Sequence, residues 1–345
     1  MKALILVLII VFTHSCIKTK PTAKAKNLNN TITILDSTLV SKFSKSITAS
    51  DFKRRLSYFA SKDFQGRKTG KIGQRKAADY LRNFYKSKNI APAFNDSTYY
   101  QTLPESFLPK GIGTSENVLA YIKGSQNPNE VLIISGHFDH LGAKDNVIHF
   151  GADDNGSGSV AITEIAEAFK LAELEGYLPK RSILFLHLTA EEIGLYGSKY
   201  YVENPVFDLK KTIANLNIDM IGRVDKRHEN TSDYLYIIGA NRISNELHLI
   251  SEKANTSFTN LVLDYKYNDE NDSNRYYYRS DHYNFAKQDI PVIFYFNGEH
   301  SDYHKPTDTA DKINYPLLAK RTQLIFATAW QLANKTDFLT PNSGF

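Results

Sequence analysis

Apolar and polar positions along the chain follow two periods, which predict helices and strands in alternation. Apolar residues recur every three or four positions over residues 77–84, 157–174 and 318–332, the spacing of helices with one buried side. The run Ile183 to Leu188 is almost entirely apolar, as expected for a strand buried on both faces. Similar short runs predict strands at residues 118–122, 131–134, 213–218, 234–238 and 292–296.

This alternation favours a central sheet whose strands are largely parallel. We therefore expect an α/β fold: a single three-layer domain with a mixed, largely parallel β-sheet and helices on both faces. In such sheets, ligand sites form at the carboxyl ends of the strands. Polar residues that directly follow a predicted strand are therefore the first candidates for chemistry.

The N-terminus has the pattern of an export signal. Lys2 precedes an apolar run over residues 3–12, which is shorter than the about 20 residues needed to span a bilayer and typical of a secretory signal. Cys16 is the only cysteine. We expect residues 1–15 to be a lipoprotein-type signal peptide, with a lipid on Cys16 as the only membrane attachment. An ordinary signal cleaved near Ser15 is the alternative.

The remaining organisation is read from composition. Residues 16–44 begin with a stretch rich in Lys, Thr, Ala and Asn without an apolar period, and we expect them to form a flexible tether. Residues 45–338 are predicted to be one catalytic domain and residues 339–345 a tail. The protein is then exported and lipid-anchored in a bacterial envelope, on an outer-membrane, periplasmic or surface face, or periplasmic or secreted if the lipid is absent.

The net charge and size of the chain exclude few classes of protein, but they give no indication of nucleic-acid binding. The 42 basic residues exceed the 37 acidic ones only slightly, so the formal net charge is +5, and part of this excess is concentrated before residue 27. A nucleic-acid partner is therefore not implied. The chain of 345 residues is 42% hydrophobic, enough for a large core.

Two adjacent carboxylates, Glu191 and Glu192, follow the apolar strand at 183–188. Neighbouring residues on a strand point to opposite sides. At the end of a strand, one carboxylate can therefore bind a metal ion while the other faces the reacting centre. Hydrolases that activate water with a metal need both a ligand and a general base.

Other predicted strands are followed by further candidate ligands. His137 can bind a metal through one ring nitrogen, and Asp139 can then accept a hydrogen bond from the other nitrogen. Asp153 lies in a glycine-rich turn before a helix and can bridge two ions, while Asp154 or Asn155 serves the backbone. Each pattern has an ordinary structural explanation as well, a turn for the first and a helix cap for the second.

Two segments complete the set. Asp219 follows the strand at 213–218, where an ion pair with Arg223 is the alternative. His300 and His304 have the spacing of a helical zinc pair, but no glutamate follows His300 and Pro306 disfavours a helix. One histidine from a loop is the better interpretation. Nitrogen and oxygen donors without cysteine suit zinc, manganese or cobalt, and the set fits two ions about 3.5–4 Å apart.

The motifs occur in an order that resembles one family. They are Gly-His-Phe-Asp, Gly-Ala-Asp-Asp-Asn, Glu-Glu-Ile-Gly-Leu-Tyr-Gly-Ser, Asp-Met-Ile-Gly-Arg and Asp-Tyr-His-Lys-Pro-x-Asp-Thr. From about residue 63 to residue 309 the chain is similar to the zinc aminopeptidases of metallopeptidase family M28. The resemblance implies the zinc-exopeptidase fold, similar to that of phosphorylases and hydrolases. Many relatives carry an inserted domain before the His-x-Asp motif, but the stretch from Lys68 to Gly136 is too short to hold it, so we expect the minimal catalytic form.

The resemblance also implies roles for individual residues. One Zn²⁺ is expected to be held by His137, Asp153 and Glu192 and a second by Asp153, Asp219 and His304, with Mn²⁺ or Co²⁺ as possible substitutes. Further expectations are that Glu191 is the general base, that Asp139 orients His137, that Asp281 hydrogen-bonds His304, and that a cis peptide joins Asp153 to Asp154. His140, His149 and His187 are interpreted as structural or rim residues.

The function implied is a co-catalytic di-zinc aminopeptidase acting on peptides, expected to be a monomer. A carboxypeptidase or other amide hydrolase on the same metal core is the first alternative, because Arg275 and Arg279 could bind a substrate carboxylate. A non-catalytic surface binding protein is the second alternative. The presence of every expected ligand and of the base argues against it.

Overall fold

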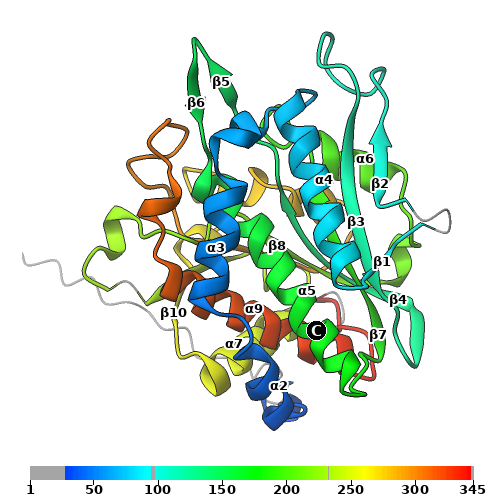
Figure 1. Ribbon diagram of the computed structural model, residues 1–345. Coiled ribbons are helices and arrows are strands. Elements are labelled where there is room, and N and C mark those ends of the chain that lie inside the picture. Colours follow the sequence, from blue (N-terminus) through cyan, green and yellow to red (C-terminus); the bar gives the residue numbers. More distant parts are fainter. Residues whose placement is uncertain (1–27, 95–97, 232, 343–345) are drawn as a thin grey trace, which may run out of the picture.

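The computed structural model describes residues 28–94, 98–231 and 233–342. Its centre is a nine-stranded mixed sheet, accompanied by a two-stranded hairpin that projects from one end of the molecule (Figure 1). The predicted signal peptide and Cys16 lie outside the described residues, as does the end of the predicted tail. None of the helices that could be searched in the described ranges has the length and apolar character of a membrane span.

Most neighbouring strands in the middle of the sheet are parallel. The order is β1-β3-β7-β4-β8-β11-β9-β10, with β2 paired to β3. Strands β7, β4, β8 and β11 are parallel to one another, whereas β3 and β9 run antiparallel to their neighbours β7 and β11. The strands are β1 (Ala91–Pro92), β2 (Tyr100–Leu103), β3 (Ser115–Ile122), β4 (Asn127–His137), β7 (Arg181–Leu188), β8 (Thr212–Ile218), β9 (Tyr234–Ile238), β10 (Val262–Asp264) and β11 (Val292–Phe296).

Successive side chains on the central strands enter two different apolar cores. In β4, Leu132 and Ile134 belong to one core, whereas Val131 and Ile133 belong to the other. This alternation is the period of two that an extended strand imposes, and it explains why the central strands are apolar at nearly every position. The sheet is therefore the middle layer of three, and the expected α/β architecture is confirmed.

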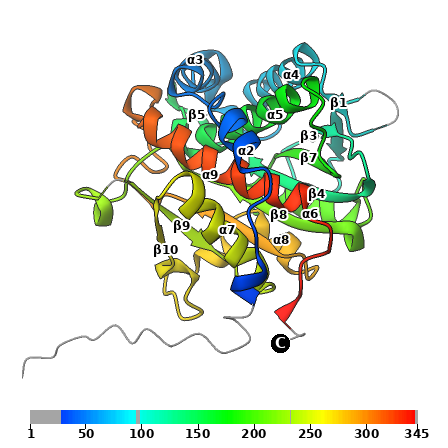
Figure 2. The ribbon, with the colours of Figure 1, turned by 90° about the horizontal axis from the view of Figure 1, so that it is seen from below.

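Helices cover both faces of the sheet (Figure 2). The larger core is closed by α2, α3, α4, α5, α7 and α9, and the smaller core by α6 and α8. The bounds are α2 (Ser37–Ser44), α3 (Ala49–Phe59), α4 (Ile72–Ser87), α5 (Gly158–Leu174), α6 (Tyr196–Glu203), α7 (Asn245–Phe258), α8 (His282–Ala286) and α9 (Tyr315–Asn334).

The domain is longer than the sequence pattern indicated. The expectation of a flexible tether is wrong for residues 28–44, because α2 buries Val40 and Phe43 in the larger core. The predicted tail is also packed over its described part, where Leu339 is buried and the Asn342 N–H donates to the Ile243 carbonyl. Few apolar residues make these contacts, so they leave no period in the sequence.

The parallel strands deliver their carboxyl ends to one edge of the sheet. Strands β4, β7, β8 and β11 are neighbours, and the segments that follow them carry the candidate ligands. The hairpin of β5 (Gly142–Lys144) and β6 (Val147–His149) rises between the first two ligand segments. Its base requires a glycine at Gly66, which has φ 67° and whose absent Cβ would lie 2.3 Å from the His149 carbonyl oxygen.

Candidate metal centre

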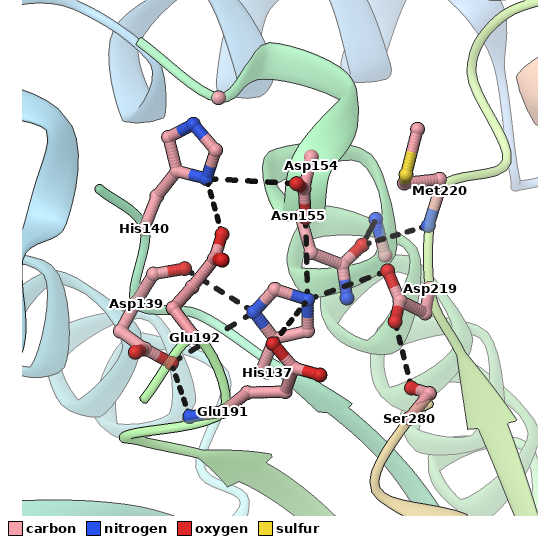
Figure 3. A network of polar contacts seen from close by, with 12 residues as sticks. His137, Asp139, His140, Asp154, Asn155, Glu191, Glu192, Asp219, Met220 and Ser280 are labelled. Carbon is pink, nitrogen blue, oxygen red and sulfur yellow. Dashed lines mark hydrogen bonds and ion pairs between the residues drawn. The ribbon is translucent and has the colours of Figure 1, made fainter. Parts of the chain in front are cut away.

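Side chains from four segments converge beyond the strand ends (Figure 3). Two groups of three have potential ligand atoms within 4.8 Å of one another among the described residues. His137 belongs to both groups, and the segments after β5–β6, β7 and β8 supply the carboxylates. The groups are His137, Glu191 and Asp219, and His137, Asp154 and Glu192.

The imidazole of His137 is buried and directs its two nitrogens to different partners. Nε2 lies 3.3 Å from Asp219 Oδ1 and 3.4 Å from Asp154 Oδ1. Nδ1 lies 3.2 Å from the backbone carbonyl oxygen of Asp139 and 3.8 Å from its Oδ1. Nε2 is thus the nitrogen on the carboxylate side, and Asp139 is on the side that sets the orientation of the ring.

His304 completes a second cluster around the same aspartate. Its Nε2 lies 3.0 Å from Asp154 Oδ2 and 3.3 Å from Glu192 Oε2. The two oxygens of Asp154 therefore face different histidines, which is the arrangement required of a bridging ligand. These closest contacts place Glu192 with His304 and Asp219 with His137, the reverse of the expected partition.

The structure corrects the expectation for Asp153. Its carboxylate faces away from His137 and His304, since Oδ1 accepts the Gly222 N–H at 2.7 Å and Oδ2 lies 3.2 Å from His300 Nε2. The cis peptide joins Asp154 to Asn155, not Asp153 to Asp154. Asp154, which was expected to serve the backbone, is thus the residue that faces both His137 and His304.

Long-range hydrogen bonds hold this turn in place. The carboxylate of Asp308 accepts the backbone N–H groups of Asp153 and Asp154 at 3.0–3.1 Å. Asn155 spans to β8, because its Nδ2 donates to the Ile218 carbonyl and its Oδ1 accepts the Met220 N–H. The segments carrying Asp154, Asp219 and His304 are therefore connected through the backbone as well as through the candidate ligands.

Glu191 lies beside the cluster with its carboxylate toward His137. Glu191 Oε2 is 3.9 Å from His137 Nε2, and the Glu191 N–H donates to Asp139 Oδ1 at 3.1 Å. Asp139 also accepts a hydrogen bond from Thr69 Oγ1 at 2.7 Å. Asp139 thus connects the segment of His137 to the segment of Glu191 and holds the backbone of Glu191 in position.

Asp281 does not have the predicted partner. It is fully buried, and no hydrogen bond or ion pair joins it to His304 within the described ranges. Burial raises its pKa to about 7, and the negative charges of Asp139 and Asp219 add to this effect. Asp281 is therefore close enough to act on the cluster by charge, but it does not position His304.

Burial and crowding shift the pKa values in the cluster. Burial raises the pKa of Glu191 well above its ordinary value, and the charges of Glu192 and Asp219 add to the rise. Burial lowers the pKa of His304, but its contacts with Asp154 and Glu192 outweigh this and raise that pKa to about 10. These shifts show that negative charge is in excess at the site.

A divalent cation fits this donor set. No lysine or arginine forms an ion pair with Asp154, Glu191, Glu192 or Asp219 in the part of the chain that the structure describes. Clustered carboxylates in a buried place need positive charge to compensate them. Imidazole nitrogens and carboxylate oxygens without thiolate are the donors that suit zinc, manganese or cobalt.

Sequence reasoning set aside one residue that the structure brings into the cluster. His140 is buried, and its Nδ1 lies 2.7 Å from Glu192 Oε1 and 3.7 Å from Asp154 Oδ2. In the sequence, its position three residues after His137 was the one feature that could have indicated a place near the site. In contrast, His187 is a structural residue, in line with the interpretation from the sequence: it is fully buried, with Tyr85 Oη 2.6 Å from its Nε2.

Comparison with known proteins agrees with this geometry. Residues 117–329 match the model of peptidase family M28. Leupeptin-inactivating enzyme 1 of Streptomyces exfoliatus is 31% identical over 75% of this chain and 50% of its own length. Aminopeptidase YwaD of Bacillus subtilis is 26% identical over 64% of this chain and 46% of its own. The chain thus spans about half the length of these sequence relatives.

Solved structures share the fold. LapA aminopeptidase of Legionella pneumophila superposes with a TM-score of 0.68 at 21% identity, covering 88% of this chain and 77% of its own. A zinc aminopeptidase of Bacillus subtilis has a TM-score of 0.65 at 16% identity, covering 84% and 97%. The match to the family model extends from β3 to α9 and includes all the segments of the cluster. The chain therefore belongs to peptidase family M28.

Proposed function

We propose that this protein is an aminopeptidase that hydrolyses the N-terminal bond of peptides and uses two zinc ions. The observation that supports this most directly is the position of Asp154 between two histidines, at 3.4 Å from His137 and 3.0 Å from His304. His137, Asp154 and Asp219 would hold one ion, and His304, Asp154 and Glu192 the other. Bound zinc lowers the pKa of water to about 7 and polarises a carbonyl group.

Glu191 is proposed as the general base. Its carboxylate lines the pocket beside His137, and its backbone is fixed by Asp139. Because burial raises its pKa, Glu191 holds a proton more firmly than an exposed glutamate. It can take the proton of the attacking water and transfer it to the leaving amine.

The pocket beside the cluster supports recognition of an amino terminus rather than a carboxyl terminus. Its lining includes the buried side chains of Met220, Phe294 and Phe296, which suit an apolar side chain of the substrate. At its rim, Arg279 Nη2 lies 3.0 Å from Glu299 Oε1, so this guanidinium already has a carboxylate partner. A carboxypeptidase would need a free cation here for its substrate, and Arg275, the other arginine considered for that role, does not line this pocket.

The location of the protein remains a prediction. We propose that it is exported and attached to a bacterial envelope through a lipid on Cys16, that it is otherwise free of the membrane, and that it is a monomer. Replacing Cys16 with serine should release the protein into the soluble fraction. Full retention in the membrane fraction after this change would exclude the lipid anchor.

The decisive experiment combines metal analysis with a panel of substrates. We expect two zinc ions per chain, hydrolysis of aminoacyl-p-nitroanilides and C-amidated peptides, and no hydrolysis of N-blocked peptides. Glu191→Gln should keep both ions but lose turnover by about 10²–10⁴-fold. Glu203→Gln, an exposed glutamate on α6, is the matched control and should be fully active. Near wild-type turnover of Glu191→Gln would exclude the proposed base, and cleavage of N-blocked peptides alone would exclude the aminopeptidase.

A further inference from the structure

His140 makes the shortest imidazole–carboxylate contact of the candidate metal centre, although it is not one of the five expected ligands. Its Nδ1 lies 2.7 Å from Glu192 Oε1 (Figure 3). The carboxylate can only accept, so Nδ1–H of His140 donates this hydrogen bond. The ring is 1% exposed, so water does not compete for the contact.

This contact divides the two oxygens of Glu192 between two histidines. Oε1 faces His140, whereas Oε2 lies 3.3 Å from His304 Nε2. The oxygen on the side of His304 and Asp154 is therefore the one free to bind an ion. A glutamate with free rotation about its last bonds could instead offer either oxygen, or both, or turn away.

The ring of His140 is itself held from two directions. Its backbone N–H donates to the Arg67 carbonyl at 3.2 Å. Gly151, with φ 56°, passes so close that a Cβ there would lie 2.5 Å from the ring carbons Cγ and Cδ2. Arg67 Nη2 donates to the Gly151 carbonyl at 2.7 Å, which keeps this glycine against the ring. The backbone of His140 and one side of its ring are therefore held in place while Nδ1 faces Glu192.

We propose that His140 is a positioning residue that orients Glu192 toward the ion shared with His304 and Asp154. This inference rests on the proposed metal centre. It predicts an effect on one of the two ions. His140 approaches Asp154 only at Oδ2, at 3.7 Å, which is the oxygen on the side of His304, and it makes no contact with His137 or Asp219 among the described residues. A residue that only fills space would not distinguish between the two ions.

The test is zinc affinity, measured by competition with a chelating dye on the full-length protein. His140→Ala should weaken one of the two ions by about 10–100-fold, the range found for residues that orient metal ligands, and leave the other unchanged. His140→Asn places an amide N–H near the position of Nδ1 and should restore most of the affinity. His140→Gln, whose amide lies one bond farther out, should not. His149, on strand β6, makes no side-chain hydrogen bond or ion pair in the part of the chain that the structure describes, and His149→Asn is the matched control.

The outcomes separate this inference from the proposed function. If all three His140 variants bind both ions like the wild type, or if Gln restores affinity as well as Asn, the positioning role is refuted. Equal weakening of both ions would also refute it. If the wild type binds no zinc, the proposed metal centre itself fails. Thermal unfolding of each variant without zinc shows whether the fold is intact, and the Asn variant keeps the test valid if Ala does not fold.

Discussion

Replacing Arg67 with methionine removes a fully buried guanidinium that connects two ligand-bearing segments. Arg67 donates from Nε to the Phe138 carbonyl at 2.8 Å, from Nη1 to the Phe150 carbonyl at 2.8 Å, and from Nη2 to the Gly151 carbonyl at 2.7 Å. The first acceptor follows His137, and the other two precede Asp154 by a few residues. The guanidinium thus fixes the distance between the two segments.

The expected loss of stability follows from these three bonds. Each buried carbonyl left without a donor costs about 1–3 kcal/mol, so the three together cost about 3–9 kcal/mol. Part of this is recovered, because burying the charge of Arg67 is itself unfavourable. Burial lowers its pKa from 12.5 to about 10, and at about 1.4 kcal/mol for each pKa unit this amounts to about 3 kcal/mol. The net destabilisation is then about 0–6 kcal/mol, with a central value of about 3 kcal/mol.

Urea denaturation of the zinc-free protein measures this quantity directly. We expect Arg67→Met to lower the free energy of unfolding by about 3 kcal/mol and also to weaken zinc binding. The free energy of unfolding of Arg67→Lys should lie between those of the wild type and Arg67→Met, because one ammonium group cannot donate to three carbonyls in the same geometry. Arg75→Met, an exposed arginine on α4, is the control and should change stability by less than about 0.5 kcal/mol. If Arg67→Met loses no more stability than Arg75→Met, the three hydrogen bonds of Arg67 do not stabilise the fold in this way.

Two further predictions test the adjacent aspartates and a remote carboxyl group. Asp154→Asn should abolish tight binding of both ions. Asp153→Asn removes the same charge one residue away and should retain two ions in metal analysis. Equal losses of metal in the two variants would show that Asp154 has no special role. Glu164 is buried, which raises its pKa to about 8 although Arg55 opposes the shift. A carboxyl group whose pKa is higher in the folded than in the unfolded state stabilises the fold when it is protonated. For Glu164 this stabilisation is complete at pH values below 4.5 and is lost as the pH rises to about 8. Glu164→Gln should therefore gain stability relative to the wild type between pH 5 and pH 8, by at most about 1.4 kcal/mol per pH unit, and parallel denaturation profiles would contradict this.

The architecture could be predicted because its signal is local. The apolar run predicted at residues 183–188 is β7 (Arg181–Leu188), and the helical spacing at 157–174 is α5 (Gly158–Leu174). Burial on both faces makes every position of a central strand apolar, and this is visible in a short window of sequence. Regions with few apolar contacts gave no such signal, and residues 28–44 were for that reason expected to be a tether.

The segments that carry the chemistry could also be identified from the sequence. Glu191 and Glu192 follow β7, and Asp219 follows β8, and parallel strands deliver their carboxyl ends to one edge whatever the loops do. In contrast, the direction of the side chains in the turn before α5 depends on contacts that form in the folded protein. The backbone of Asp153 and Asp154 is held by Asp308, more than 150 residues later in the chain. The direction of a carboxylate in an irregular turn depends on such distant partners, and so does the contact of His140 with Glu192.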